Sequence, residues 1–586
     1  MQDINNLNIR ASSLKEFWGT EYNNDLYLWE GAKHNLSLAE IKKLKEQTFK
    51  DLFSSEESIN SAVKNCRSIY FKYLPLLSDK LNHIHKVNFP VEFWQTFFGF
   101  WLYRHISIVY EKYSVLSKID IDYTSIVLLD LKSFYTPSEH YDYVNCFCND
   151  FGVQQLVSQY YYLFKKKNFP TLEKSHVLTK IPRKSIRLVL KIIFNLSKIL
   201  VITKRLLIKI KTKLFSTTKP NTVLLSTYYS NKVLNELHKR SSGKINTIEL
   251  PNVKLSKSAF CNEKRNTLTE LEVNNNFEKY LNETFYYCFP KIFIENFSIY
   301  HRVFLHDISR KNFKSIVSSG WIGMNDVALY IALAKNMSKL VIDQEHSTGN
   351  MILKGANVWI NRTFNRKYIT SGWKSKDSNL IQGGFIIDDI KEYYFSKDKS
   401  SILFIGHTRF PFLMEFGSHA SNSNYIREIN AVDQFIDLLP DNLINKFLYR
   451  PRKGSQFWDV EATLELQEKK IKIDNEDFTK SILCSKIIII DHISAGLSTL
   501  LMMRAPFLVL INPHISISKE YTLIFKALVT CGVAHYSPES AVNQLSSIYF
   551  DVENWWKNDT VQVPINQLKS KYLESPSKTI DFLLSV

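Results

Sequence analysis

Short apolar runs alternate with helix-forming segments from about residue 221 to residue 511, and this alternation leaves few folds open to the chain. The clearest run is KIIII, Lys486–Ile490, in which four isoleucines follow one another. Apolar runs of about four to eight residues are typical of parallel strands that are buried on both faces. The sequence therefore predicts an α/β fold with doubly wound parallel sheets. The expected strands are Thr222–Thr227, Lys339–Asp343, Tyr368–Ser371, Ser401–Ile405, Phe447–Tyr449, Lys486–Ile490 and Phe507–Ile511.

Helices are expected between these strands and before them. The expected helices are Asp326–Lys335, for which Asn325 is the N-cap, Ser423–Leu439 and Ala495–Met503. The aromatic-rich stretch Val91–Tyr113 is interpreted as a buried core helix, with a helix that shapes a ligand groove as the alternative.

A chain of 586 residues is too long for a single hydrophobic core. We expect a mainly helical region over residues 1–215 and two Rossmann-like domains over residues 216–395 and 396–586. The charged segment Asp388–Ser400 is the expected junction. Two such domains in tandem enclose a cleft, and ligands bind where the strands end at their carboxyl side.

The net charge of +18 favours an anionic partner: nucleic acid, a membrane surface or a phosphate-rich substrate. Ten lysines and arginines, and no acidic residue, lie in the aliphatic segment Ile181–Phe215. This pattern is typical of a basic amphipathic helix on an anionic membrane; a solvated helix packed by its apolar side is the alternative. Because no nucleic-acid-binding module is found, we expect no nucleic-acid partner.

The sequence shows no secretory signal at its start and no uncharged apolar run of about 18–20 residues. Its seven cysteines form no metal-binding or disulfide pattern. A cytoplasmic protein is expected, peripheral on the inner face of the membrane if Ile181–Phe215 binds lipid.

The most informative polar segment, DHISAGLSTL, directly follows the KIIII run and enters a helix. Backbone N–H groups at a helix start, together with nearby hydroxyls, can hold phosphate oxygens. An ordinary capped turn between strand and helix is the alternative. The candidate phosphate-binding residues are His492, Ser494, Gly496, Ser498 and Thr499.

Two further strand ends carry cationic side chains. His407 and Arg409 follow Gly406, a residue that would let a ligand approach the backbone closely. Arg450 and Arg452 lie two residues apart, so they share a face of an extended segment and suit a phosphate or carboxylate. Solvated surface loops are the alternative for both segments.

The segment DQEHSTGN follows the expected strand Lys339–Asp343 in the first domain. Asp343, Glu345 and His346 are candidates for a general base that removes a proton from a hydroxyl. For each of the three, a structural role in the turn is the alternative.

Several common catalytic patterns are missing from the sequence. There is no Walker A loop, no G-x-G-x-x-G, no H-E-x-x-H and no G-x-S-x-G. The Asp-x-Asp at Asp120–Asp122 falls in the helical region and is interpreted as a coincidental turn. We therefore expect neither a metal ion nor a cofactor.

The ordered set of these segments resembles a leptospiral-type transferase family of bacterial O-antigen and surface-polysaccharide loci. FWQTFFGFWLYRHISIVYEKY is similar to the family's tryptophan-rich element, represented here by Trp94, Trp101 and Leu102. ITSGW, VAHYSPESAVNQL and NWWKNDTVQ, with Trp555 and Trp556, also resemble family segments. DHISAGLSTLL is similar to the phosphate-binding turn of CDP-glycerol, Kdo and sialic-acid transferases. DQEHSTGN departs from the family's turn, which has glycines where this chain has serine and threonine.

The resemblance implies a GT-B fold, in which two Rossmann-like domains face a cleft, with a helical N-terminal extension. It implies an acceptor-side domain over residues 216–395 and a nucleotide-sugar-binding domain over residues 396–586. The implied reaction is metal-independent, inverting transfer of a sugar to a glycan or lipid-linked glycan. The likeness to Kdo and sialic-acid transferases favours a CMP-linked nonulosonic or ulosonic acid, whose carboxylate would suit Arg450 and Arg452. A non-catalytic GT-B-like scaffold of a membrane-bound assembly complex is the alternative.

Overall fold

The computed structural model describes most of the chain. His346, the Asp120–Asp122 turn and the basic segment 181–215 lie outside the described residues, so their expected roles stay predictions. The described ranges are 7–18, 25–44, 47–119, 124–164, 168–176, 220–253, 259–319, 325–345, 351–353, 367–386, 390–417, 422–452, 454, 456–513 and 516–586.

The first large sheet has six parallel strands in the order β11-β10-β9-β8-β6-β7. Its order reverses between β6 and β8, which makes that pair its switch point. The central strands β6 and β8 are buried at every position, whereas the edge strands β7 and β11 are partly exposed. The strands are β6 (Thr222–Leu225), β7 (Ile245–Ile248), β8 (Ser315–Ser319), β9 (Leu340–Gln344), β10 (Lys367–Thr370) and β11 (Leu380–Gln382).

The second large sheet is also parallel and has the order β14-β13-β12-β15-β16-β17. If the six strands are numbered 1 to 6 by their order along the chain, they lie side by side in the order 3-2-1-4-5-6, which is that of a Rossmann fold. The switch point of this sheet lies between β12 and β15. The strands are β12 (Ile402–Ile405), β13 (Phe447–Arg450), β14 (Lys472–Ile473), β15 (Ile487–Ile490), β16 (Phe507–Leu510) and β17 (Ala534–His535).

Successive residues of β15 pack into different cores, because side chains alternate along a strand. Ile488 and Ile490 contact the core that includes α17 (Ala495–Met503). Ile487 and Ile489 pack in the core of α13 (Asn422–Asp437) on the other face. The other helices of this domain are α14 (Asp441–Ile444), α15 (Val460–Thr463), α16 (Phe478–Cys484), α18 (Thr522–Thr530), α19 (Pro538–Ile548), α20 (Val552–Lys557) and α21 (Asp559–Tyr572).

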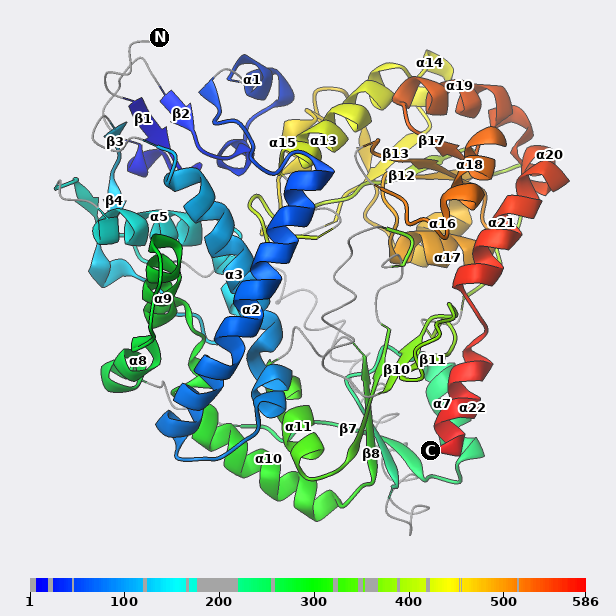
Figure 1. Ribbon diagram of the computed structural model, residues 1–586. Helices are drawn as coiled ribbons and strands as arrows, with labels where there is room; N and C mark the ends of the chain where they lie inside the picture. Colours follow the sequence, from blue (N-terminus) through cyan, green and yellow to red (C-terminus); the bar gives the residue numbers. More distant parts are fainter. Residues whose placement is uncertain are drawn as a thin grey trace, which may run out of the picture.

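The final helix, α22 (Pro576–Ser585), leaves the second sheet and packs against α7 (Asn231–Arg240) beside the first (Figure 1). Arg240 and Asp581 form an ion pair of 2.8 Å at this crossing. The two sheet domains also meet directly, because the N–H of Ser518 donates to the carbonyl of Ile352 at 2.7 Å. The two Rossmann-like domains of a GT-B fold are thus present, and the predicted α/β fold class is confirmed.

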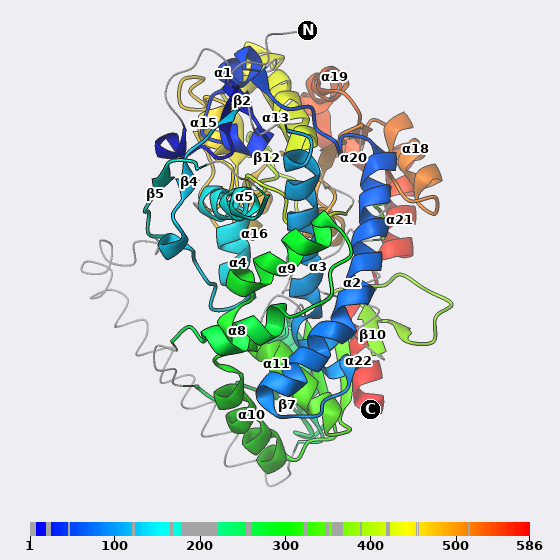
Figure 2. The ribbon, with the colours of Figure 1, turned by 60° about the vertical axis from the view of Figure 1, so that its left-hand side comes forward.

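The N-terminal region is mainly helical, as expected, and it contacts both sheet domains. Its central helix α3 (Val91–Leu116) is buried and packs on α2 (Glu56–His85) and on α11 (Asn325–Asn336) of the first domain. At its other end, α1 (Leu38–Lys43) shares a core with α13 of the second domain (Figure 2). The N-terminal region also contains α4 (His140–Phe147) and α5 (Asp150–Phe164). Three helices from the first domain's part of the chain lie beside it: α8 (Asn262–Thr269), α9 (Asn276–Cys288) and α10 (Phe297–Lys311).

Two local features differ from the sequence predictions. The N-terminal region contains a small parallel sheet of β1 (Leu7–Arg10), β2 (Asp25–Tyr27) and β3 (Thr124–Ser125), which the helical pattern did not indicate. Asn325 is not an N-cap; it is the first residue of α11, and its side chain accepts the N–H of His140. Within the described ranges, no helix combines the length and the apolar character needed to cross a bilayer.

Candidate functional site

The candidate site lies at the switch point of the second sheet. The neighbouring strands β12 and β15 end at Ile405 and Ile490, which face each other in register. The polar segments that follow these strands therefore emerge side by side, where ligands of open α/β sheets bind. His407 and His492, both predicted from the sequence, stack here with ring centroids 4.9 Å apart.

Asp491 holds the two histidines together. Its carboxylate accepts the backbone N–H of His407 at 2.8 and 3.0 Å, and its Oδ1 lies 2.7 Å from Nδ1 of His492. Asp491 is buried, so these contacts replace the water it would otherwise bind. The carboxylate thus orients the imidazole of His492 and fixes the backbone that carries His407.

A second carboxylate, Glu428 of α13, holds Arg409 at 2.8 Å and also accepts from the amide of Asn512 at 3.0 Å. His407 Nδ1 lies 3.7 Å from Glu428. Burial lowers the pKa of His407, and the positive charge of Arg409 lowers it further, although Glu428 acts in the opposite direction. His407 is therefore held as a neutral imidazole close to a guanidinium.

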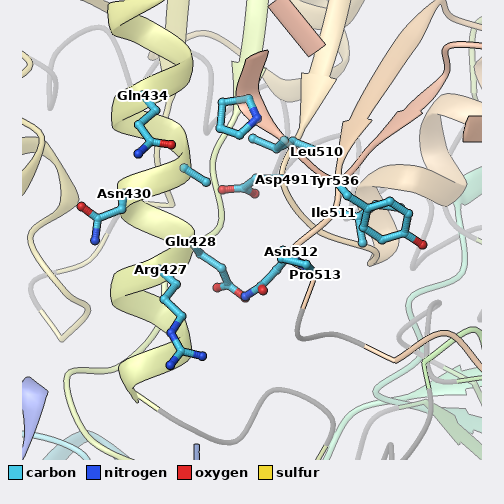
Figure 3. A pocket seen from close by; sticks show the side chains of 12 residues that line it. Arg427, Glu428, Asn430, Gln434, Asp491, Leu510, Ile511, Asn512, Pro513 and Tyr536 are labelled. Atoms are coloured by element: carbon cyan, nitrogen blue, oxygen red, sulfur yellow. The ribbon is translucent and has the colours of Figure 1, made fainter. Parts of the chain in front are cut away.

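A pocket of about 270 Å³ adjoins this cluster (Figure 3). It opens between α13 and the carboxyl ends of β15, β16 and β17. Figure 3 shows Glu428 reaching from the helix toward Asn512, with Tyr536 on the opposite side. The pocket thus combines polar groups with an aromatic ring and apolar side chains such as Leu510 and Ile511, as small-molecule sites do.

The start of α17 is the predicted phosphate-binding turn, and its residues divide into two groups. Ser494 is the N-cap, with its hydroxyl 3.4 Å from the N–H of Gly496, and a Cβ on Gly496 would meet only that hydroxyl, at 3.9 Å. This end of the helix is open to a ligand. Ser498 is fully buried, and the hydroxyl of Thr499 donates to the carbonyl of Ala495. The geometry therefore does not support the prediction that these two hydroxyls hold phosphate.

Arg450 and Arg452 do not share one role. The guanidinium of Arg450 pairs with Asp474 and also donates to the carbonyl of Glu476 at 2.9 Å. Arg452 instead lies over the ring of Phe457, and its backbone N–H donates to the hydroxyl of Thr408 beside His407. The guanidinium of Arg450 is thus committed to Asp474, whereas the pair of contacts to Arg452 holds that residue beside the candidate site.

Gly406 is required for a reason that the sequence did not reveal. A Cβ on this residue would lie 2.1 Å from the hydroxyl oxygen of Tyr449 on the neighbouring strand. The glycine thus lets β12 and β13 pack around a buried tyrosine. A close approach of ligand to the backbone is not needed to explain it.

In the first domain, Glu345 follows β9 and is almost fully buried. Its Oε2 accepts from the N–H and the hydroxyl of Ser371, each at 2.7 Å, and from the indole of Trp373 at 2.8 Å. A carboxylate oxygen with three donors is stabilised in its charged form and is a poor base. This arrangement indicates that Glu345 joins the ends of β9 and β10.

Asp343 is also buried, two residues earlier on β9, where it pairs in register with Ser318 and Tyr368. Its negative charge adds to burial in raising the pKa of Tyr229. Tyr521, from the second domain, has its pKa raised by burial and, to a smaller extent, by Glu345. The ends of the first sheet therefore lie against the second domain.

Sequence reasoning missed three partners of the site: Asp491, Glu428 and Asn512. Asp491 and Asn512 each follow a predicted strand closely, so strand-end position could have identified them. Glu428 lies on a helix face, and nothing in its local sequence distinguishes it. Among the described residues, no group of three or more His, Cys, Asp or Glu is placed to bind a metal ion.

Comparison with known proteins gives one sequence match and many structural ones. The family model described as LIC12162 family transferase matches residues 8–585. No curated protein shows significant sequence similarity.

Similar solved structures include three proteins with which the chain shares low identity. MurG of Acinetobacter baumannii is 12% identical, with 63% of this chain and 100% of that chain covered and a TM-score of 0.31. The glycosyltransferase SnogD from Streptomyces nogalater is 9% identical, with 63% and 99% covered and a TM-score of 0.33. Anabaena HepE, in complex with UDP and glucose, is 10% identical, with 63% and 100% covered and a TM-score of 0.36. Since these scores are low, the fold rests on the strand orders above.

Proposed function

Because the chain belongs to the LIC12162 family of transferases, we propose that it transfers a sugar from a nucleotide-sugar donor to a growing bacterial surface glycan. The observation that carries the proposal is the His407–Asp491–His492 cluster at the switch point of a Rossmann-ordered sheet. Nucleotide ligands of such sheets bind at this position.

The donor is proposed to lie across the cluster and the adjoining pocket. Its nucleoside would occupy the pocket beside Tyr536 and Asn512, and its phosphate would face the start of α17 at Ser494 and Gly496. Support comes from the open helix start, whose N–H groups and dipole favour an anion.

Departure of the nucleotide leaves negative charge on its phosphate, which must be stabilised in the transition state. Arg452 and the two stacked imidazoles are proposed to supply most of this stabilisation, and Arg409, which shares its charge with Glu428, is proposed to supply a smaller part. Fixed cationic and N–H groups can serve in place of a divalent cation, so the reaction is proposed to need no metal.

The acceptor is proposed to bind at the ends of the first sheet, with His346 or Asp343 as the base for its hydroxyl. Glu345 is a weaker candidate because its carboxylate oxygen already accepts three hydrogen bonds. A lipid-linked acceptor would place the protein at the inner face of the membrane, and residues 181–215 are proposed to make that contact.

A CMP-linked nonulosonic or ulosonic acid is the donor we propose to test first. Arg452 would meet the carboxylate that distinguishes such a sugar; Arg450 is less suited, because Asp474 already neutralises it.

The test is a thermal-shift screen of the purified protein against CMP, CDP, UDP, GDP and dTDP, with and without EDTA. A rise of the unfolding midpoint with one nucleotide in EDTA would support a metal-free donor site, since a ligand that binds only the folded state stabilises it. A rise with UDP or GDP alone would reject the CMP donor. If none of the five nucleotides raises the unfolding midpoint, the result would favour a non-catalytic scaffold.

A further inference from the structure

The segment that carries His407 and Arg409 does not stay within the second domain. We call residues 406–417 the donor loop. Its first half lies at the strand ends of the second sheet, whereas Phe412, Leu413 and Phe416 are buried in the core of the N-terminal helices. The same core includes α3 and the α11 residues of the first domain.

Gly31 packs closely against this loop. A Cβ on Gly31 would lie 2.1 Å from the carbonyl oxygen of Pro411 and 2.9 Å from the ring of Phe412. The first distance is to backbone, which cannot rotate away. Any side chain at position 31 must therefore displace the donor loop or the segment around Gly31.

A buried cation lies beside this contact. Lys112 of α3 has no exposed surface, and its ammonium is 4.1 Å from the ring centroid of Trp29 and 5.1 Å from that of Phe412. Its charge is balanced by the adjacent Glu111. A desolvated cation between two rings is strongly attracted to both, so it ties the N-terminal segment to the loop.

Polar contacts hold the rest of the loop. Arg104 pairs with Glu415 at 2.9 Å, and both side chains are mostly buried. The hydroxyl of Tyr103 donates to the carbonyl of Phe416 at 3.3 Å, and the N–H of Phe412 donates to the carbonyl of Cys148 at 3.2 Å.

From these contacts we infer that the N-terminal region is the part of the chain that positions the donor loop, with Gly31 and Arg104 as positioning residues. The inference rests on the proposed function, in which His407 and Arg409 meet the donor. Because α3 packs on α11 of the first domain, the N-terminal region also fixes the position of the donor loop relative to that domain, where the acceptor is proposed to bind. Ordering the loop before the donor binds lowers the entropic cost of assembling the site.

The experiment measures hydrogen–deuterium exchange of residues 406–417 in the full-length protein and in the variants Gly31→Ala and Arg104→Met. We expect exchange in the loop to rise by about tenfold or more in both variants, because its local opening becomes easier. In Arg104→Lys, the retained charge should restore part of the protection. If nucleotide binding follows the proposal, KM for the donor should rise more than kcat falls.

Two variants serve as matched controls. A Cβ on Gly384 would also meet backbone, 1.9 Å from the carbonyl of Ser575, but it lies at the crossing of α22. Arg265→Met removes an equally direct pair, with Glu295 at 2.7 Å, in a part of the chain that belongs to the first domain and does not contact the donor loop through this pair. Gly384→Ala and Arg265→Met should reduce overall stability and leave exchange of the donor loop unchanged.

Unchanged exchange of residues 406–417 in both folded test variants, or an equal rise in the controls, would overturn the inference. The readout needs no nucleotide. If the unmodified protein binds none of the five nucleotides, the proposed function fails, while the exchange data still decide whether the N-terminal region positions the loop.

Discussion

The backbone N–H of His407 donates to both carboxylate oxygens of Asp491, at 2.8 and 3.0 Å, although 84 residues separate the two in the chain. The contact exists because β12 and β15 are neighbours in the sheet. It brings two loops that follow different strands into one site.

Asp491→Asn should disturb the site and the fold together. The amide keeps one acceptor oxygen and loses the charge that holds two imidazole-bearing segments, so we expect a loss of about 1–3 kcal/mol in the free energy of unfolding. Nucleotide affinity should fall by at least about tenfold. Chemical denaturation and calorimetric titration measure the two effects. Asp477→Ala, which removes the side-chain N-cap of α16, is the control: it should cost stability only.

Gly496→Ala separates phosphate binding from helix stability. A methyl group fits at this position, and alanine in place of glycine in a helix gains about 0.5–1 kcal/mol. If phosphate covers the helix start, the same methyl group should weaken nucleotide binding. The expected outcome is therefore a higher unfolding midpoint with a lower affinity. Ser498→Ala, buried in the same helix, should leave affinity unchanged, and an equal loss in both variants would contradict the proposed placement.

The two arginines after β13 should behave differently. Arg450→Met leaves the buried carboxylate of Asp474 without its cation, and we expect a loss of about 1–3 kcal/mol at neutral pH with nucleotide affinity retained. Arg452→Met should keep the stability and weaken donor binding. Denaturation curves and titrations on both variants check this, and a loss of affinity in Arg450→Met alone would reverse the assignment.

The stability difference of Arg450→Met should also depend on pH. Burial acts to raise the pKa of Asp474, but hydrogen bonds from Ser481 and Arg450 hold that pKa below its ordinary value of 3.8. A depressed carboxyl pKa contributes stability that is present above 3.8 and lost as the pH falls through the lower, folded value. The variant and the unmodified protein should therefore converge in stability as the pH falls through this range.

His407 should titrate below its ordinary value of 6.5, because burial and the nearby Arg409 lower its pKa. Its neutral form stabilises the fold fully above pH 6.5, and that contribution is lost as the pH falls through the depressed pKa. Removing the guanidinium in Arg409→Met should raise the pKa of His407. NMR titration of labelled histidines measures the shift; an unchanged or lower value in the variant would contradict the electrostatic role of Arg409.

The variants Glu345→Gln and His346→Ala should show whether Glu345 has a structural role and whether His346 is the catalytic base. The three donors on one oxygen of Glu345 predict that Glu345→Gln reduces stability by about 1–3 kcal/mol. If His346 is the base, His346→Ala should reduce sugar transfer by about 100-fold or more, with donor hydrolysis less affected. Assays with and without acceptor check this, and full transfer by His346→Ala would leave Asp343 as the candidate.

The sequence by itself determined seven of the twelve strands of the two large sheets, but not β7, β8, β11, β14 and β17, and it determined the edge of the sheet at which the site lies. Runs such as Ile487–Ile490 are apolar at every position, and only a strand covered on both faces buries all of them. Polar residues such as His407 and His492 directly follow such runs, so their place at the carboxyl edge is a local property of the chain.

Only the tertiary structure decided which of these residues act together. Arg450 and Arg452 lie two residues apart after the same strand, and nothing in the sequence distinguishes them. In the structure, Asp474 neutralises Arg450. Gly31 contacts the donor loop across most of the chain's length, and its own sequence contains no sign of it. Local patterns report the hydrophobicity and backbone preferences of neighbouring residues, whereas charge pairing and close packing depend on which strands and helices become neighbours in space.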